Sequence, residues 1–455
     1  MQSAKFHLAT ALMPDGWRED VTVTVGTDGM IAALTPGREQ GAVPVSGIAV
    51  PAMPNVHSHA HQRFMLGLAE RAGPGADSFW TWREAMYGFA LRLSPDDLEA
   101  VAAQLYVEML KAGFSVVGEF QYLHHQPDGR AYMNPAEMSL RCLAAADTAG
   151  IGITILPTLY AHGGFGGQPP AHGQRRFVTS VDQFLSIVDH LSIQVKGKPF
   201  HRLGISPHSL RAVTPDLLRE VADALPPDMP IHIHVAEQVK EVEDCLAFSG
   251  LRPVEMLLKE FALSDRWTAI HATHMTAGET EALARSGAIA GLCPTTEANL
   301  GDGIFPAVSF MREGGAIAIG SDSHITVSPA EDLRMLEYSQ RLRDRTRNAL
   351  AAGPGQSTGR SLYEAALKGG ARSMRQPVGA LAPGLRFDIA VLDQEHPLLA
   401  GRRNDAALDT WIFSGGTALV KDVFVAGRQV VEDRRHIHED MIARNFRAAL
   451  RRLDT

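Results

Sequence analysis

Eight short apolar runs rich in β-branched residues alternate with longer helical stretches, and this alternation constrains the fold more than any other feature. Parallel strands need a crossover connection, which is usually a helix, so strands that alternate with helices predict a parallel sheet. Residues 96–112 and 135–149 are two such helical stretches. Eight strand–helix units predict a (β/α)8, TIM-type barrel in the α/β class. The runs are Ile48–Val56, Ser115–Phe120, Ile151–Pro157, Arg202–Ser206, Pro230–Val235, Trp267–His271, Ala288–Leu292 and Ala316–Gly320.

The two ends of the chain have a different pattern, with the period of two that is typical of half-buried strands. Val21, Val23 and Val25 share one face, and Thr22 and Thr24 share the other. Comparable runs occur near the other end, at 387–392, 418–425 and 429–431. We expect both ends to form one small β-sandwich, closed by a helix at about 436–452. The predicted domains are 1–49 and 376–455, the two parts of the β-sandwich, and 50–375, the barrel.

Length and charge narrow the class of protein further. A barrel uses roughly 250 residues, so 455 residues leave room for a second, smaller domain. The 43 basic and 51 acidic residues give a net charge of −8, which argues against a nucleic-acid partner, because phosphate binding requires a basic surface. The three cysteines are scattered and predict a reducing, cytoplasmic location. The apolar stretch at 8–13 is too short for a membrane span or signal peptide.

Polar side chains gather at the carboxyl ends of the predicted strands, where barrel active sites form. The first run ends in His57-Ser58-His59, and residues two apart in a strand project from one face. Both histidines can therefore reach one metal ion, although such a pair also occurs as structural residues. The fifth run contains His232 and His234. His234 lies nearer the mouth and is the predicted ligand, whereas His232 is expected to be a packed or hydrogen-bonded barrel residue.

Three further polar residues follow the fifth, sixth and eighth runs. Glu237 follows the fifth run, and a carboxylate beside a metal-bound water can carry protons; an ordinary solvated loop glutamate is the alternative. His271 ends the sixth run, and Asp322 follows the eighth. Each could be a satisfied polar residue at a strand end. Together with the histidines they point to a metal-dependent active site, because such groups converge at the mouth of a barrel.

A set of three imidazoles and one carboxylate suits Zn²⁺, with Fe²⁺ or Mn²⁺ as alternatives. Such an ion lowers the pKa of a bound water, so that hydroxide is available near neutral pH. The sequence therefore predicts a hydrolase that uses an activated water.

Several segments resemble the amidohydrolase superfamily, in its mononuclear, deaminase-like branch. They are the HSH that follows Pro51–Asn55, the HIHVAE of 232–237, His271 and the SDSH of 321–324. The resemblance covers nearly the whole chain, and the two-part β-domain fits it. Within the superfamily the sequence is similar to the N-formimidoyl-L-glutamate deiminases. The segments that carry this similarity are 57–63, 80–83, 117–125 and 207–211.

This resemblance implies a role for each polar residue of the predicted site. Glu237 would be the proton shuttle, and His271 and Asp322 would steady the attacking water. Members with two metals usually carry a bridging lysine at the end of the fourth strand, but Lys196 and Lys198 precede that strand here, so one ion per chain is expected. The implied metal ligands are His57, His59, His234 and Asp322. The implied substrate-binding residues are Gln62, Arg83, Tyr122, His208 and Arg211.

The resemblance also implies the reaction. It is hydrolysis of N-formimidoyl-L-glutamate to N-formyl-L-glutamate and ammonia, a step of histidine degradation. The substrate is a small dicarboxylate, and the planar fork of arginine suits carboxylates, which is consistent with Arg83 and Arg211 as partners. Family resemblance alone implies a homodimer.

Two other functions remain open from the sequence. The first is a deaminase of a purine, pterin or triazine ring, which would keep the metal site but need fewer cations in the pocket. The second is a catalytically inactive barrel that serves as a scaffold. Lost ligands would mark such a scaffold, and every predicted ligand position here holds a ligating residue.

Overall fold

The computed structural model describes residues 3–70, 75 and 77–453, and within them eight parallel strand positions follow one another as predicted. The first four positions pair in the order β5-β6-β7-β8, with β9 against β7, and the last four in the order β10-β11-β12-β13. The strands are β5 (Met53–Ser58), β6 (Phe114–Gln121), β7 (Gly152–Leu159), β8 (His201–Leu203), β9 (Ser206–Pro207), β10 (Ile231–Val235), β11 (Trp267–His271), β12 (Ile289–Leu292) and β13 (Ala316–Ile319).

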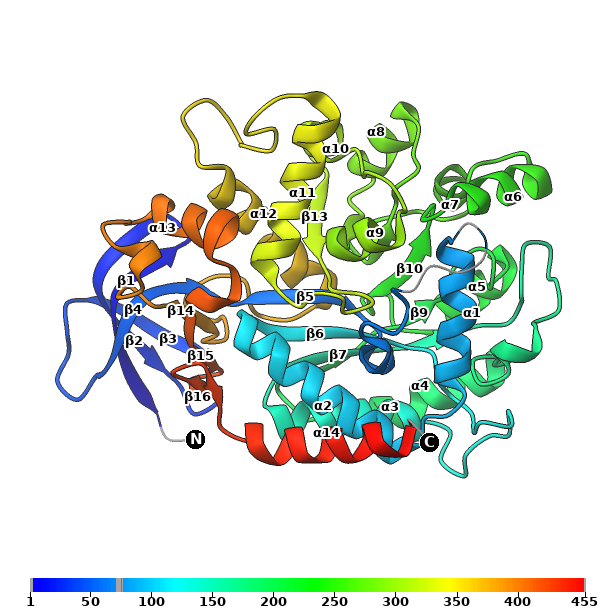
Figure 1. The fold of residues 1–455 in the computed structure, drawn as a ribbon, viewed down its shortest axis with the longest axis horizontal. Helices are drawn as coiled ribbons and strands as arrows, with labels where there is room; N and C mark the ends of the chain where they lie inside the picture. Colours follow the sequence, from blue (N-terminus) through cyan, green and yellow to red (C-terminus); the bar gives the residue numbers. More distant parts are fainter. Residues whose placement is uncertain (1–2, 71–74, 76, 454–455) are drawn as a thin grey trace.

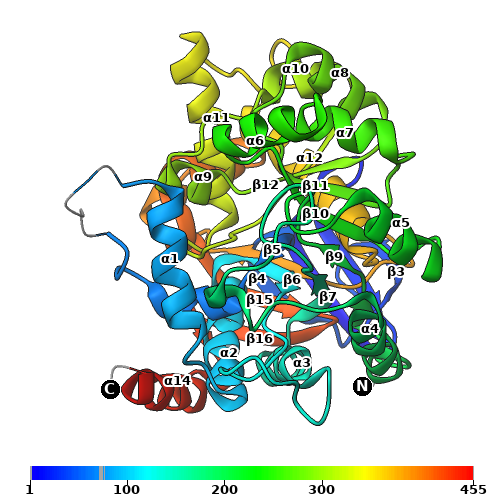
Figure 2. The same ribbon diagram turned by 90° about the vertical axis from the view of Figure 1, so that its right-hand side faces the viewer.

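Isolated bridges join the two groups of strands into a closed barrel. Parallel bridges at Ile205–Ile231 and Ser209–His234 connect the fourth position to β10. A further parallel bridge between Ser58 and Asp322 connects the end of β13 to the end of β5. Figure 2 shows the strands at the centre of the molecule with helices around them. The closure places the two ends of the barrel sequence side by side.

The helices begin and end where local chemistry favours it. Ser94 caps α2, Pro95 occupies its first turn, and Gly113 ends it with a φ of 101° that favours glycine. The α-helices are α1 (Phe79–Ala90), α2 (Pro95–Ala112), α3 (Glu137–Ala149), α4 (Val181–Val195), α5 (Pro215–Ala224), α6 (Val239–Ser249), α7 (Pro253–Glu260), α8 (Ala277–Arg285), α9 (Pro294–Leu300), α10 (Ala307–Arg312), α11 (Pro329–Asp344), α12 (Thr358–Met374), α13 (Asp405–Thr410) and α14 (Glu439–Leu453). Shorter turns are η1 (Ala60–Met65), η2 (His172–Gln174), η3 (Pro397–Leu399), η4 (Trp411–Gly415) and η5 (Gly416–Leu419).

Strands from both ends of the chain join in one continuous eight-stranded sheet beside the barrel (Figure 1). The two ends meet where β14 pairs antiparallel with β4, with Ile389 opposite Pro51. The expectation that both ends form one unit is confirmed, and a two-layered sandwich remains a prediction. In sheet order the strands are β17 (Arg435–His436), β16 (Arg428–Glu432), β15 (Val420–Val425), β14 (Ile389–Leu392), β4 (Val43–Pro51), β1 (Ala4–Met13), β2 (Gly16–Val25) and β3 (Ile31–Pro36).

Two details of the sequence prediction are wrong. The run at 48–56 is not one strand, because its first part belongs to β4 of the end sheet and its second part to β5 of the barrel. The C-terminal helix does not close the end sheet; α14 lies along α2 of the barrel (Figure 1). Ion pairs hold it there, with Lys111 Nζ 2.6 Å from Glu439 Oε1, and Arg452 paired with Asp97. The domain boundaries at 49/50 and 375/376 remain predictions.

Among the described helices, none combines the length and the apolar character that crossing a membrane would require.

Candidate metal centre and substrate pocket

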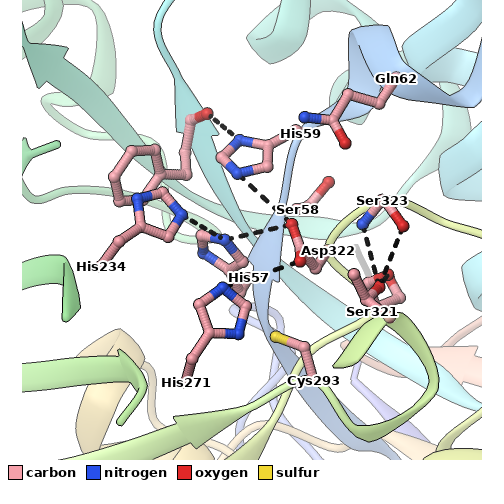
Figure 3. A network of polar contacts seen from close by, with 12 residues as sticks. His57, Ser58, His59, Gln62, His234, His271, Cys293, Ser321, Asp322 and Ser323 are labelled. Atoms are coloured by element: carbon pink, nitrogen blue, oxygen red, sulfur yellow. Dashed lines mark hydrogen bonds and ion pairs between the residues drawn. The ribbon is translucent and has the colours of Figure 1, made fainter. Parts of the chain in front are cut away.

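Three strand ends bring three imidazoles and a carboxylate to one point (Figure 3). His57 lies in β5 and His59 directly follows it, His234 lies in β10, and Asp322 follows β13. His57 Nε2 lies 3.1 Å from His234 Nε2, and the Nε2 atoms of His57 and His59 each lie 3.5 Å from Asp322 Oδ1. All four side chains are buried. The structure therefore gathers the predicted ligand set into one cluster.

The ring orientations of these histidines suit a divalent cation. His59 Nδ1 donates to the Phe120 carbonyl oxygen, and His234 Nδ1 donates to the His208 carbonyl oxygen, each over 2.9 Å. These bonds place the proton on Nδ1 and leave Nε2 as a lone-pair donor facing the cluster. Burial lowers the pKa of His57, His59 and His234, which favours the neutral state that binds metal. The donor set therefore fits an ion such as Zn²⁺.

His271, at the end of β11, lies beside this cluster with both ring nitrogens facing carboxylates. Nδ1 is 3.3 Å from Glu297 Oε1, and Nε2 is 3.9 Å from both Glu237 Oε1 and Asp322 Oδ2. Burial opposes the charged form, but the three carboxylates outweigh it and raise the pKa of His271 to about 10. Sequence reasoning missed Glu297, because no motif marks a helical glutamate that reaches across to another strand end.

Glu237 is a buried residue, not a solvated loop glutamate. Its side chain is 6% exposed, and the Glu241 carboxylate accepts hydrogen bonds from the backbone N–H groups of Ala236 and Glu237. Burial raises the pKa of Glu237 to about 7, opposed by His271 and Arg211. A carboxylate with a pKa near neutrality can both accept and return a proton.

The backbone is strained at the same strand ends. Ala236, His271 and Asp322 have φ values of 51°, 68° and 46°, in the left-handed region that residues with a Cβ atom rarely adopt. Such strain persists where the surrounding structure enforces it, and it is common at active sites.

Another buried carboxylate supports the end of β5 and the turn that follows it, where His57 and His59 lie. Glu119 accepts hydrogen bonds from Ser58 Oγ at 2.6 Å, the Ala60 N–H at 2.7 Å and Tyr106 Oη at 3.0 Å. Burial raises its pKa to about 7. Glu119 belongs to one of the segments that carry the family resemblance, but its supporting role depends on contacts that the sequence does not display.

A pocket opens from the cluster toward α1 and contains every substrate-binding residue that the sequence predicted. Its lining includes Gln62, Arg83, Tyr122, His208 and Arg211, together with His59, His234, Glu237, His271 and Asp322. His57 is the exception among the predicted site residues, since it lies fully buried behind this lining.

The two arginines reach the pocket from different elements. Arg83 projects from α1, and its guanidinium carbon lies 4.5 Å from the centroid of the Trp80 ring. Arg211 follows β9, and its Nε lies 3.8 Å from Glu241 Oε2. The Nε atoms of both arginines are buried and have no hydrogen-bond partner in the described part of the chain. Both therefore keep donors available for an anion.

Aromatic residues that the sequence prediction did not single out complete the wall. Tyr87 comes from α1, while Tyr160 and Phe177 come from the segment between β7 and α4. Gln174 of the same segment donates to Tyr160 Oη over 2.6 Å. No spacing in the sequence marks these aromatic residues as a set.

Comparison with known proteins agrees with this fold. Residues 48–430 match the amidohydrolase family, and the chain therefore belongs to this family. It is 53% identical to formimidoylglutamate deiminase of Pseudomonas aeruginosa over 96% of both chains, and residues 5–43 match the N-terminal domain of formimidoylglutamate deiminase. The resemblance seen in the sequence is confirmed.

Solved structures support the same assignment. The crystal structure of an amidohydrolase from Brucella melitensis superposes with a TM-score of 0.94 at 50% identity, covering 99% of this chain and 100% of that one. An adenosine deaminase from Xanthomonas campestris, described with bound zinc, shares the fold with a TM-score of 0.83 at 21% identity, covering 99% and 98% of the two chains.

Removal of one imidazole from the cluster tests whether it holds an ion. We expect His234→Ala to lose most of its bound divalent metal, because the cluster loses one of its converging Nε2 atoms. His232→Ala is the matched control, since His232 lies on the same strand but bonds to the Ser373 carbonyl oxygen at 3.1 Å. Elemental analysis after purification measures the metal, and equal metal contents in both variants would contradict the assignment.

Proposed function

We propose that this chain hydrolyses N-formimidoyl-L-glutamate to N-formyl-L-glutamate and ammonia, and that the cluster at the base of the pocket holds one zinc ion. The observation that carries the proposal is the pair of arginines. Arg83 and Arg211 face the same pocket as the imidazole cluster, and each keeps a buried Nε donor without a hydrogen-bond partner among the described residues. A dicarboxylate substrate supplies the missing acceptors.

In this proposal the metal is held by the imidazoles of β5 and β10 and by the carboxylate after β13. When bound, such an ion acts as a Lewis acid and lowers the pKa of water. The ligands are His57, His59, His234 and Asp322, whose atoms converge within the cluster.

Glu237 carries the proton. Its carboxylate takes a proton from the attacking water as oxygen adds to the formimidoyl carbon, and it delivers that proton to the departing nitrogen. The proton that remains on the added oxygen reaches the same nitrogen through the same carboxylate. The C–N bond to this nitrogen then breaks, ammonia leaves, and the carbon retains the new oxygen as a formyl group. His271 directs Nε2 toward Glu237 and Asp322, where it stabilises charge that develops on oxygen.

Polar groups around the two arginines orient the rest of the substrate. Gln62 Nε2 donates to Tyr122 Oη over 3.0 Å, and Gln62 Oε1 is buried without a hydrogen-bond partner in the described structure. Burial raises the pKa of Tyr122 well above its usual range, so its hydroxyl stays protonated. His208 lies at the base of the pocket, with a pKa that burial lowers, and serves as a neutral hydrogen-bonding partner.

The direct test is turnover of N-formimidoyl-L-glutamate by the purified enzyme, with ammonia and N-formyl-L-glutamate both measured. We expect the two products in equal amounts. A panel of purine, pterin and triazine amines is run in parallel, because a ring deaminase would use the same metal cluster. Ammonia release from a ring compound, with no turnover of the amidine, would overturn the proposed substrate.

Glu237→Gln tests the proton step. Glutamine keeps the size of the side chain but does not accept and return a proton at neutral pH, so we expect kcat to fall by at least about 10²-fold. Metal content should stay at the wild-type level. A loss of less than tenfold, measured by ammonia release at saturating substrate, would remove Glu237 from this role.

Arg211→Met tests recognition of a carboxylate. Methionine keeps much of the apolar stem and deletes the guanidinium, and we expect kcat/KM to fall by about 10- to 100-fold, since each ~1.4 kcal/mol is tenfold. Arg211→Lys should recover only part, because an ammonium does not form the bidentate pair.

Arg219→Met is the matched control for this experiment. Arg219 is an exposed arginine that pairs with Asp216 and Glu260 on the outside of the barrel. Its variant should keep wild-type kinetics. If Arg211→Met behaved like Arg219→Met toward this substrate, the ring-deaminase function would be favoured instead.

Two further parts of the proposal have other grounds. Family resemblance predicts a homodimer, which sedimentation of the purified protein tests. The scattered cysteines predict a cytoplasmic location, which cell fractionation tests.

A further inference from the structure

A second cavity lies on the outer side of the two pocket arginines. It is bounded by α1, by α6 and by the loop that follows β7. Arg83 and Arg211 line both this outer cavity and the inner pocket, so the two spaces meet at the guanidinium groups. The other residues that matter here are Trp80, Phe165, Lys240 and Asp244.

Three cations surround one aromatic ring in the outer cavity. The guanidinium carbons of Arg83 and Arg211 lie 4.5 and 5.9 Å from the centroid of Trp80, and Lys240 Nζ lies 6.0 Å from it. Cations within about 6 Å of a ring face are attracted to it. The attraction of the ring therefore offsets part of the repulsion among the three positive charges.

The charge of this lining is positive although the whole protein is acidic. Among the residues that the structure describes, Asp244 is the one acidic residue in the lining, and it contacts Lys240 Nζ at 2.7 and 2.8 Å. Glu241, which lies 3.8 Å from Arg211, is almost fully buried. With three cations against one carboxylate, the lining attracts anions to a chain with a net charge of −8.

The three cations also form a gradient from solvent to the interior. The side chain of Lys240 is 56% exposed, that of Arg83 is 22% exposed, and that of Arg211 is 10% exposed. An anion that arrives from solvent meets the ammonium first and the most buried guanidinium last. Lysine suits the outer position because its flexible stem lets a hydrated charge follow a moving partner.

We propose that the outer cavity is an anion-binding site in which Lys240 receives a carboxylate of the substrate and passes it to Arg83 and Arg211. The inference rests on the proposed function, since it requires an anionic substrate. It assigns to Lys240 a positioning role in substrate capture and no part in the chemical step.

A charge series at Lys240 and Asp244 tests this site. In Lys240→Gln we expect the KM for N-formimidoyl-L-glutamate to rise about three- to tenfold at low ionic strength. The loss should appear in KM and not in kcat, because the ammonium lies outside the reacting centre.

Asp244→Asn should lower KM by about twofold, and the double variant should return close to the wild-type value, since it restores the charge of the lining. At ~0.5 M salt, where screening is strong, the KM of Lys240→Gln should approach the wild-type KM.

The pair Lys198 and Asp147 provides a matched control. Lys198 Nζ lies 2.7 Å from Asp147 Oδ2, with side chains 44% and 53% exposed, and it precedes β8 at the opposite end of the barrel. Lys198→Gln makes the same change in net charge far from the pocket, and its KM should stay at the wild-type value.

The outcomes separate the two proposals. If the wild-type enzyme does not turn over N-formimidoyl-L-glutamate, the proposed function fails. If it does, but Lys240→Gln and Lys198→Gln have the same KM at low salt, the outer site fails while the function stands. A fall in kcat with unchanged KM in Lys240→Gln would also overturn the capture role.

Discussion

The pairing of β13 with β5 is the contact on which the site depends. The Asp322 N–H donates to the His57 carbonyl oxygen over 3.0 Å, and the His59 N–H donates to the Asp322 carbonyl oxygen over 3.3 Å. These backbone bonds close the barrel and also bring two imidazoles and a carboxylate together. Gly320 permits the approach, because a Cβ there would lie 2.8 Å from the His57 backbone nitrogen.

Buried carboxylates organise the site around this closure. Glu119 holds the loop of His57 and His59, Glu297 holds His271, and Glu241 holds the backbone that leads to Glu237. The oxygens of each carboxylate accept hydrogen bonds from buried donors, which would otherwise be unsatisfied. The side chains that face the pocket thus keep defined orientations. Their charges are therefore preorganised, and no rearrangement is needed during the reaction.

Sequence analysis predicted which polar side chains meet, because these residues stand at the ends of predicted strands. His57, His59, His234 and Asp322 stand at strand ends, so the barrel fold already implied that they converge. The prediction was wrong at 48–56, where one apolar run is divided between strands of two sheets. It was also wrong about the position of α14, because an amphipathic helix does not specify which partner it packs against. The support by Glu297 and the aromatic wall of Tyr160 and Phe177 also escaped prediction, since they depend on contacts between distant segments.

The sequence by itself determined the barrel, the family and the placing of histidines and an aspartate at strand ends, because hydrophobic periodicity and the spacing of histidines are local properties. Tertiary structure alone decided the charge of the pocket. Whether Arg83 and Arg211 serve a substrate or the surface depends on which carboxylates the fold places beside them, and the fold left both Nε atoms without a hydrogen-bond partner in the described residues. Burial then sets how strongly each charge acts, and burial is a property of the packed chain.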